Sequence, residues 1–236
     1  MIRVLGIGMG PQHVTPEVAS ALRECDYVIA ASKRQEDELL AVRRAICEAH
    51  GVELVAVPDP ERDREPVGDG GYVRAVADWH SARVAAYRSV LDERPGTVGF
   101  LVWGDPALYD STIRIVESLG EEYDVLPGVS APQALAAAHR IVLHEVGKPV
   151  VITTERRLRA DIAAGATNLV VMLTSGFEPA GLEDWRIWWG ANLGTASAEL
   201  VSGRAGDVIG DLTDARSRAK AAAGWVMDVY LLRRSS

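Results

Sequence analysis

The chain contains only two cysteines in 236 residues, and it lacks long apolar runs. Cys25 and Cys47 stand in helix-like contexts without the spacing of a metal site, which is typical of reduced thiols in the cytosol. No apolar run approaches the ~20 residues that a membrane-spanning helix needs. The first residues enter a predicted strand directly, so we expect no signal peptide. The sequence therefore predicts a cytoplasmic protein without a membrane partner.

The chain also lacks an excess of basic charge, because its 33 acidic residues outnumber its 25 lysines and arginines. The formal net charge is −8 and is spread over the chain, whereas binding to nucleic acid needs a basic stripe. A local arginine cluster can still hold a polyanionic small molecule, and Arg62 and Arg64 lie close together, with Arg74 and Arg83 further along. No His, Cys and Glu set has metal-ligand spacing, and no Gly-x-Ser-x-Gly elbow occurs. We expect no nucleic-acid partner and no metal.

Strand-like and helix-like segments alternate over residues 1–147. The chain is long enough for one large or two small domains. This alternation predicts an α/β fold with a mostly parallel, doubly wound sheet. The predicted strands are 3–7, 26–30, 52–57, 98–103 and 123–126, and the predicted helices are 15–24, 36–49, 73–91, 110–119 and one that ends near 138.

The pattern changes after about residue 147. Five strand candidates follow with fewer helices between them, which predicts a second α/β domain with a mixed sheet. We place the boundary in the segment 144–149, giving domains 1–147 and 148–236. The strand candidates are 150–152, 169–173, 186–189, 199–201 and 225–232.

A Gly-Asp-Pro turn follows the apolar run 98–103, in the stretch from Trp103 to Thr112. Gly104 and Pro106 end that strand, and loops at the carboxyl ends of strands are where open α/β sheets bind ligands. The alternative is an ordinary connection in which Asp105 caps the next helix.

The opening loop contains Gly6, Gly8 and Gly10, with Pro11 after them. A dinucleotide-binding loop needs Gly-x-Gly-x-x-Gly, and here the third glycine comes one residue early. An NAD-dependent oxidoreductase is therefore a minority hypothesis. An ordinary tight turn between strand and helix fits the same residues.

These two loops and the later segment 127–131 resemble, in order, three motifs of the tetrapyrrole (corrin/porphyrin) methylase family. The segments 59–64, 79–83, 103–112, 152–154 and 156–158 are similar to a branch that couples methyl transfer to loss of an acyl group. The resemblance runs nearly end to end. It implies transfer of a methyl group from S-adenosylmethionine to a carbon of a corrin precursor, an active-site cleft between two α/β domains, and a homodimer.

Positions that match the family's motifs are expected at the ligands. The opening loop would line the tetrapyrrole site through Gly8, Gly10 and Pro11. Contacts to S-adenosylmethionine are implied for the two later loops and for the strand end near residue 172, whose register is uncertain by one residue. The cofactor positions are Trp103, Gly104, Asp105, Leu108, Ser130, Ala131, Met172 and Leu173.

The acyl loss needs a base to guide water and stabilisation of a developing oxyanion. Our candidates for this proton chemistry are His80, Tyr87, Asp110 and Asp63, although each could be an ordinary packed or surface residue. For the carboxylates of the substrate the candidates are Arg62, Arg64 and Arg83, because a guanidinium binds a carboxylate through two hydrogen bonds. For Arg83 a solvated helix charge is the alternative.

Three other functions stay open at this stage. One is a methylase of the same family that acts at another ring carbon, and another is the NAD-dependent oxidoreductase. The third is a non-catalytic tetrapyrrole carrier that keeps the binding residues without the chemistry.

Overall fold

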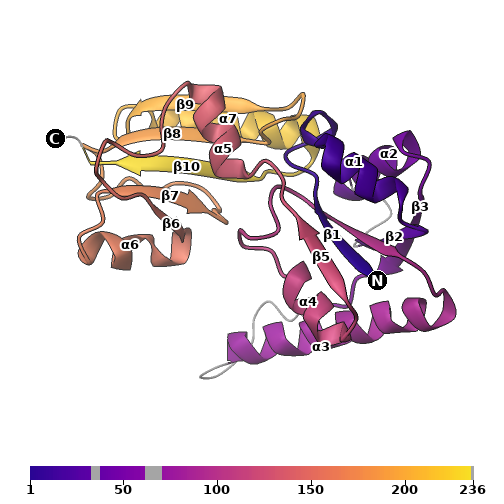
Figure 1. The fold of residues 1–236 in the computed structure, drawn as a ribbon. Coiled ribbons are helices and arrows are strands. Elements are labelled where there is room, and N and C mark those ends of the chain that lie inside the picture. The colour runs from indigo at the N-terminus through magenta and orange to yellow at the C-terminus, as the bar shows by residue number, and fades with distance from the viewer. Residues whose placement is uncertain (33–37, 62–70, 235–236) are drawn as a thin grey trace. The chain divides into compact units, whose positions relative to one another are not determined.

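The computed structural model describes residues 1–32, 38–61 and 71–234. The chain divides into two compact units, Met1–Val129 and Ser130–Ser236. Each unit contains one five-stranded sheet with helices packed against it (Figure 1). The predicted pair of α/β domains, one with a parallel and one with a mixed sheet, is confirmed.

The first unit holds a fully parallel sheet in the order β3-β2-β4-β1-β5. All five strands lie where the sequence predicts them, within one or two residues. The strands are β1 Ile2–Gly6, β2 Tyr27–Ser32, β3 Glu53–Pro58, β4 Val98–Val102 and β5 Tyr123–Leu126. The helices are α1 Pro16–Arg23, α2 Glu38–Ala49, α3 Gly71–Glu93 and α4 Thr112–Leu119, with a short 3₁₀ helix at Pro11–His13.

Both faces of this sheet are covered by helices. Successive side chains of a strand point to opposite faces, so Ile2 and Val4 of β1 pack into the cluster that includes α3 and α4. Leu5 of the same strand packs with α1 and α2 on the other face. The sheet is therefore doubly wound. Because helices cover both faces, we expect a ligand to bind at the loops that follow the strands.

The second unit has a mixed sheet in the order β6-β7-β10-β8-β9. β6 and β7 pair in parallel, and the remaining pairs are antiparallel. The strands are β6 Val151–Thr154, β7 Asn168–Met172, β8 Arg186–Ala191, β9 Glu199–Arg204 and β10 Asp228–Arg233. The helices are α5 Ala131–His139, α6 Glu155–Ala163 and α7 Ile209–Ala223.

Two of these helices, α6 and α7, were not located from the sequence. The buried face of α7 consists of Leu212 and three alanines. Small side chains give a weak helical repeat of hydrophobicity, which explains why the sequence pattern did not reveal this helix.

The division between the units falls at Val129/Ser130, earlier than the predicted boundary at 147/148. The difference is due to α5, which packs on β8 and β10. Its Leu135 is completely buried, and Nε2 of His139 donates to the carbonyl of Trp189 at 2.9 Å. The helix thus belongs to the second unit, although it follows directly on the alternating pattern of the first.

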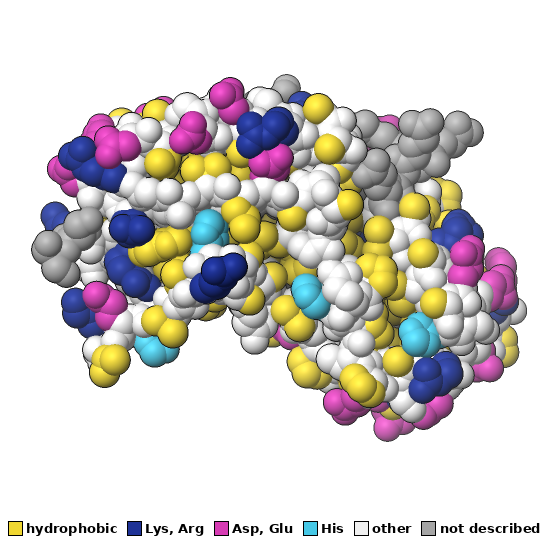
Figure 2. All heavy atoms as spheres, turned by 90° about the horizontal axis from the view of Figure 1, so that it is seen from above, with side chains coloured by type: hydrophobic (Ala, Val, Ile, Leu, Met, Phe, Trp, Pro, Cys, Tyr) yellow, Lys and Arg dark blue, Asp and Glu magenta, His cyan; other side chains and the backbone are white. Residues whose placement is uncertain are grey.

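Charged side chains of both signs share the molecular surface with hydrophobic ones, as one face shows (Figure 2). In the part of the chain that the structure describes, no helix is long and apolar enough to cross a membrane. Among the exposed hydrophobic residues are Tyr109 and Leu173, and both adopt a positive φ.

Candidate functional site

Three loops of the first unit meet at the carboxyl ends of β4, β1 and β5, which are neighbours in the sheet. They are the Gly-Asp-Pro loop after β4, the glycine-rich loop after β1 and the Pro-Gly-Val segment after β5. The carboxyl ends of parallel strands are where open α/β sheets bind ligands. The structure thus brings the three motifs of the first unit to one edge of the sheet.

Gly8 and Gly104 join the first two of these loops. The N–H of Gly8 donates to the carbonyl of Gly104 at 3.1 Å, and the N–H of Gly104 donates to the carbonyl of Gly8 at 2.8 Å. Both glycines have a positive φ. A Cβ on Gly8 would lie 2.4 Å from Cβ of His13, whereas a Cβ on Gly104 would meet Sδ of Met9 at an ordinary 3.8 Å. The backbone at Gly104 is therefore open enough for the close approach of a ligand.

Asp105 ties the Gly-Asp-Pro loop to the loop after β5. Its Oδ1 accepts a hydrogen bond from the N–H of Ala107 at 2.8 Å, and its Oδ2 accepts one from the N–H of Gly128 at 3.0 Å. The next helix is served by Asp110 instead, whose Oδ1 accepts from the N–H of Thr112 at 2.6 Å. The helix start that the alternative interpretation gave to Asp105 is thus bound by Asp110, and Asp105 holds two loops together.

Gly6 and Gly128 let these loops pack backbone against backbone. A Cβ on Gly128 would lie 2.2 Å from the carbonyl oxygen of Gly104, and a Cβ on Gly6 would lie 2.5 Å from the nitrogen of Gly128. Real Cβ atoms do not approach other atoms so closely, so both positions require glycine. These two glycines therefore act by allowing the loops to pack closely together.

The remaining predicted positions on the first unit border the same loops. Trp103 is half-buried and packs against the core beside α1 and α2. Leu108 is half-buried, and its N–H donates to the carbonyl of Asp105 at 3.2 Å. Gly10 precedes the 3₁₀ helix that begins at the exposed Pro11.

Ser130 and Ala131 begin α5. The Oγ of Ser130 accepts from the N–H of Gln133 at 3.5 Å, while Oε1 of Gln133 accepts from the N–H of Ser130 at 2.8 Å. These reciprocal bonds form a capping box. The hydroxyl of Ser130 therefore has a structural partner, and Ala131 is the first helical residue.

Met172 and Leu173 lie where β7 ends in the second unit. Leu173 has φ +54° and a side chain exposed by 64%. A left-handed conformation is uncommon for leucine, and such residues cluster at ligand-binding sites. The loop that follows is fixed by Glu155, whose Oε2 accepts from the N–H and from the Oγ of Ser175 at 2.8 and 2.9 Å.

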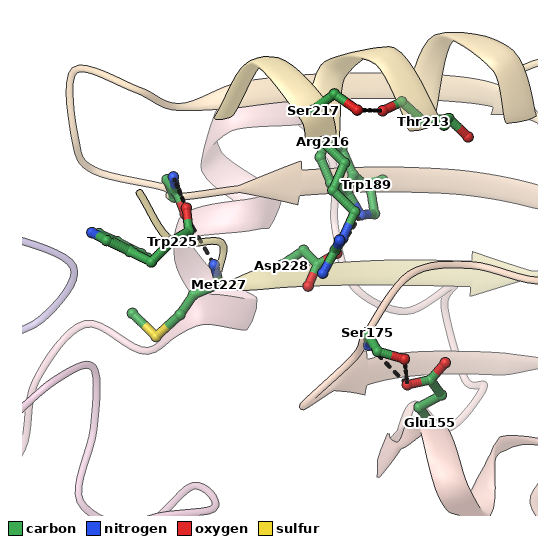
Figure 3. A network of polar contacts seen from close by, with 10 residues as sticks. Glu155, Ser175, Trp189, Thr213, Arg216, Ser217, Trp225, Met227 and Asp228 are labelled. Atoms are coloured by element: carbon green, nitrogen blue, oxygen red, sulfur yellow. Dashed lines mark hydrogen bonds and ion pairs between the residues drawn. The ribbon is translucent and has the colours of Figure 1, made fainter. Parts of the chain in front are cut away.

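Two polar residues that sequence reasoning missed lie at the same edge of the second sheet, where β8 ends and β10 begins. One of them, Asp228, is labelled in Figure 3. Asn192 has φ +47° and is buried, and its Oδ1 accepts from the N–H of Met227 at 2.9 Å. The side chain of Asp228 is 1% exposed, and its Oδ2 accepts from Nε of Arg216 at 3.0 Å. The available signal was a carboxylate inside the apolar run 226–232.

The described catalytic candidates differ in their surroundings. Tyr87 is 5% exposed and packs against Phe100 in the core. Its pKa is raised, mainly by burial, so the hydroxyl stays protonated. His80 lies half-buried beside Trp79, with 5.2 Å between the ring centroids. Asp63 lies outside the described residues.

Of the three arginine candidates, Arg83 lies in the part of the chain that the structure describes. Arg83 is paired with Asp59, with 2.6 Å between Nε and Oδ1. It is not the solvated helix charge of the alternative interpretation, because its side chain is only 13% exposed. Arg62 and Arg64 lie outside the described residues.

The sequence was compared with protein families and with known proteins, and both comparisons found matches over most of the chain. The model of the family described as Tetrapyrrole (Corrin/Porphyrin) Methylases matches residues 1–208. A precorrin-6A synthase (deacetylating) from Sinorhizobium sp. is 41% identical over 252 residues, which cover all of this chain and 95% of that protein.

Solved structures with a similar fold are also found among methyltransferases and cobalamin-related proteins. The structure of a cobalamin synthesis related protein, CobF, from Corynebacterium diphtheriae superposes with a TM-score of 0.84 at 35% identity, covering 100% of this chain and 99% of that one. A uroporphyrin-III C-methyltransferase from Thermus thermophilus, solved with S-adenosyl homocysteine, has a TM-score of 0.61 at 17% identity. The coverage there is 98% of this chain and 91% of that one, and the likeness concerns the fold.

Proposed function

This chain belongs to the tetrapyrrole (corrin/porphyrin) methylase family, and from that premise we propose that it is a precorrin-6A synthase of the deacetylating kind. It is a methyltransferase of cobalamin biosynthesis. It transfers a methyl group from S-adenosylmethionine to C1 of precorrin-5 and releases the two-carbon acyl group as acetate, which gives precorrin-6A. The 41% identity to such an enzyme over the whole chain carries this conclusion.

The residues at the loops fit S-adenosylmethionine. Gly104 offers backbone that a ligand can approach closely, and Asp105 holds that loop against the loop after β5. The strained, exposed Leu173 is where a second set of contacts is expected. The cofactor supplies an electrophilic methyl group on a sulfonium. The assigned cofactor residues are Trp103, Gly104, Asp105, Leu108, Ser130, Ala131, Met172 and Leu173.

The acyl loss is the step that this chain's proton-transfer residues must support. Water adds to the acyl carbon, the carbon–carbon bond to the ring breaks, and acetate leaves. The electron pair stays on the ring carbon, which then attacks the methyl group in line, a step governed by positioning. His80 and Asp110 are the described candidates that could take the proton from water. Tyr87, protonated in the core, is limited to donating.

Substrate binding, assembly and location complete the proposal. Gly8, Gly10 and Pro11 would face the tetrapyrrole, and Arg62, Arg64 and Arg83 would bind its carboxylates. The assembly would be a homodimer in the cytoplasm, where the buried thiols of Cys25 and Cys47 stay reduced. Sedimentation equilibrium tests the dimer, because the chain mass is 25.4 kDa and a monomer mass would refute it.

The reaction is tested by counting products. The enzyme is incubated with precorrin-5 and S-adenosylmethionine carrying a labelled methyl group, and acetate and transferred methyl are measured together. One acetate per methyl group supports the proposal. Methyl transfer without acetate would indicate a methylase acting at another ring carbon, and neither product would indicate a carrier.

The role of His80 is tested in the same assay. If it guides the attacking water, His80→Ala should cut acetate release by roughly 10²- to 10⁴-fold, as is typical for loss of a general base. Binding of S-adenosylmethionine, measured by calorimetry, should persist. Normal acetate release would leave Asp110 as the remaining described candidate for the base.

A further inference from the structure

Arg83 is fixed by contacts on two sides. Its Nε donates to Oδ1 of Asp59 at 2.6 Å, and its guanidinium carbon lies 4.0 Å from the centroid of the Trp79 ring. Trp79 is itself anchored, because its Nε1 donates to the carbonyl of Pro60 at 3.1 Å. Asp59 follows β3 directly, and its N–H donates to the carbonyl of Ser32 at the end of β2 at 2.9 Å. The arrangement joins helix α3 to the ends of two strands.

The outer edge of this guanidinium is not used by the fold. The side chains of Asp59 and Arg83 are 7% and 13% exposed. Among the described residues, Nη1 and Nη2 of Arg83 have no hydrogen-bond partner, and neither atom is completely enclosed. A guanidinium presents its N–H groups in a rigid fork that matches a carboxylate. One side of the fork is held, and the other can still bind an anion.

The cluster lies near the carboxyl-end edge of the first sheet. Asp59 is the first residue after β3, and Tyr87 stands one helical turn beyond Arg83 on α3. The charges that act on the Tyr87 hydroxyl are those of Arg83, Asp59, Arg43 and Asp110. Since Asp110 ends the Gly-Asp-Pro loop, Arg83 shares this edge with the loop assigned to the cofactor.

We propose that Asp59 and Trp79 are positioning residues that hold Arg83 with its Nη edge outward for a carboxylate of the tetrapyrrole substrate. The inference rests on the proposed function, which supplies a substrate with several carboxylates. Trp79 supports one face of the guanidinium, and Asp59 binds Nε. Because the rotamer is fixed before the substrate arrives, less side-chain entropy is lost on binding. The competing role is purely structural, in which the cluster only attaches α3 to β3.

Three conservative variants separate the two roles. Asp59→Asn keeps the shape and one acceptor but removes the charge, Arg83→Lys removes the fork, and Trp79→Phe keeps an aromatic face but removes the indole N–H. Arg88→Gln is the matched control, because Arg88 lies on the same helix and forms an exposed ion pair with Glu121. KM for precorrin-5, kcat, affinity for S-adenosylmethionine and melting temperature are measured for each.

We expect Asp59→Asn and Arg83→Lys each to raise KM for precorrin-5 by about tenfold or more, the size expected for a lost charge-assisted pair. The control should leave KM unchanged. Affinity for S-adenosylmethionine and kcat at saturating precursor should stay close to those of the native enzyme. Trp79→Phe should raise KM less, because the stacked face remains.

The double variant Asp59→Asn, Arg83→Lys gives the sharpest comparison. If Asp59 acts through Arg83, the double variant has the KM of Arg83→Lys alone, since the effects of coupled residues do not add. Additive effects on KM, or a lower melting temperature with unchanged KM, would overturn the positioning role. If the native enzyme neither released acetate nor transferred a methyl group in a measurable amount, the proposed function would fail instead.

Discussion

At the scale of single residues, two carboxylates of one loop have different structural tasks. Asp105 accepts backbone hydrogen bonds from its own loop and from Gly128, while Asp110 serves the start of α4. The spacing of these residues is visible in the sequence. The partner of Asp105 is not, because Gly128 lies on a loop that only the sheet order brings alongside.

Replacing Asp105 tests the importance of that connection. Asp105→Ala should weaken binding of S-adenosylmethionine by about tenfold, because the loss of hydrogen bonds to a charged acceptor leaves the loop free to move. Asp105→Asn keeps one carbonyl acceptor and should lose less. Titration calorimetry measures both. If the alanine variant bound as tightly as the native protein, the cofactor would not depend on this loop.

The two thiols give a residue-scale prediction with a defined pH window. Burial raises the pKa of Cys25 to about 11 and that of Cys47 to about 12, whereas unfolded thiols ionise near pH 8.5. Their protonated form is thus favoured by folding. This contribution to stability is complete below about pH 8.5 and is lost as pH rises towards 11 and 12.

Thiol reactivity measures the same effect. At pH 8 the folded protein should react with a disulfide reagent on the order of 100-fold more slowly than the unfolded chain, because thiolate is the reactive form. The free energy of unfolding is measured by denaturant titration at pH 7.5 and at pH 10. Between these two pH values it should fall less in the double variant Cys25→Ala, Cys47→Ala than in the native protein. Rapid labelling of the folded protein would contradict the buried environment.

At the scale of elements, the site depends on how closely three loops can pack. Gly6, Gly104 and Gly128 bring backbone within distances that exclude a Cβ at positions 6 and 128. The sequence shows these glycines as isolated features of separate motifs. Only the order β4-β1-β5 turns them into one contact.

Gly128→Ala should therefore be severely destabilising, by about 3 kcal/mol or more, because its Cβ would meet backbone that cannot move aside. The matched control is Gly210→Ala in the first turn of α7, where a Cβ would have open space. That change should be neutral or stabilise by up to about 1 kcal/mol, since glycine is unfavourable in a helix. Denaturant unfolding of both variants checks the difference.

At the scale of the whole molecule, the boundary between the units decides which fragment can fold. Fragment 130–236 retains α5, whose buried Leu135 lies next to Gly190 of β8. Fragment 148–236 lacks that helix and would expose the apolar surface beneath it. We expect cooperative thermal unfolding, followed by circular dichroism, from fragment 130–236 and not from fragment 148–236. A cooperative transition in the shorter fragment would support the boundary predicted from sequence.

By itself the sequence determined the strands, the helices of the first unit and the family. In the part of the chain that the structure describes, strand and helix periodicity located the strands of both sheets and the helices of the first unit, because these patterns depend on neighbours in the chain. The loop motifs pointed to the family for the same reason, as each is a continuous segment.

The tertiary structure alone decided the assignment of α5 to the second unit and the partners of Asp105, Arg83, Asn192 and Asp228. Those partners stand 23 residues away for Asp105 and Gly128, 24 for Arg83 and Asp59 and 35 for Asn192 and Met227. Arg216 and Asp228 are 12 residues apart and meet across α7 and β10. Local periodicity carries no information on such contacts, because they arise only when strands assemble into a sheet and helices cover it.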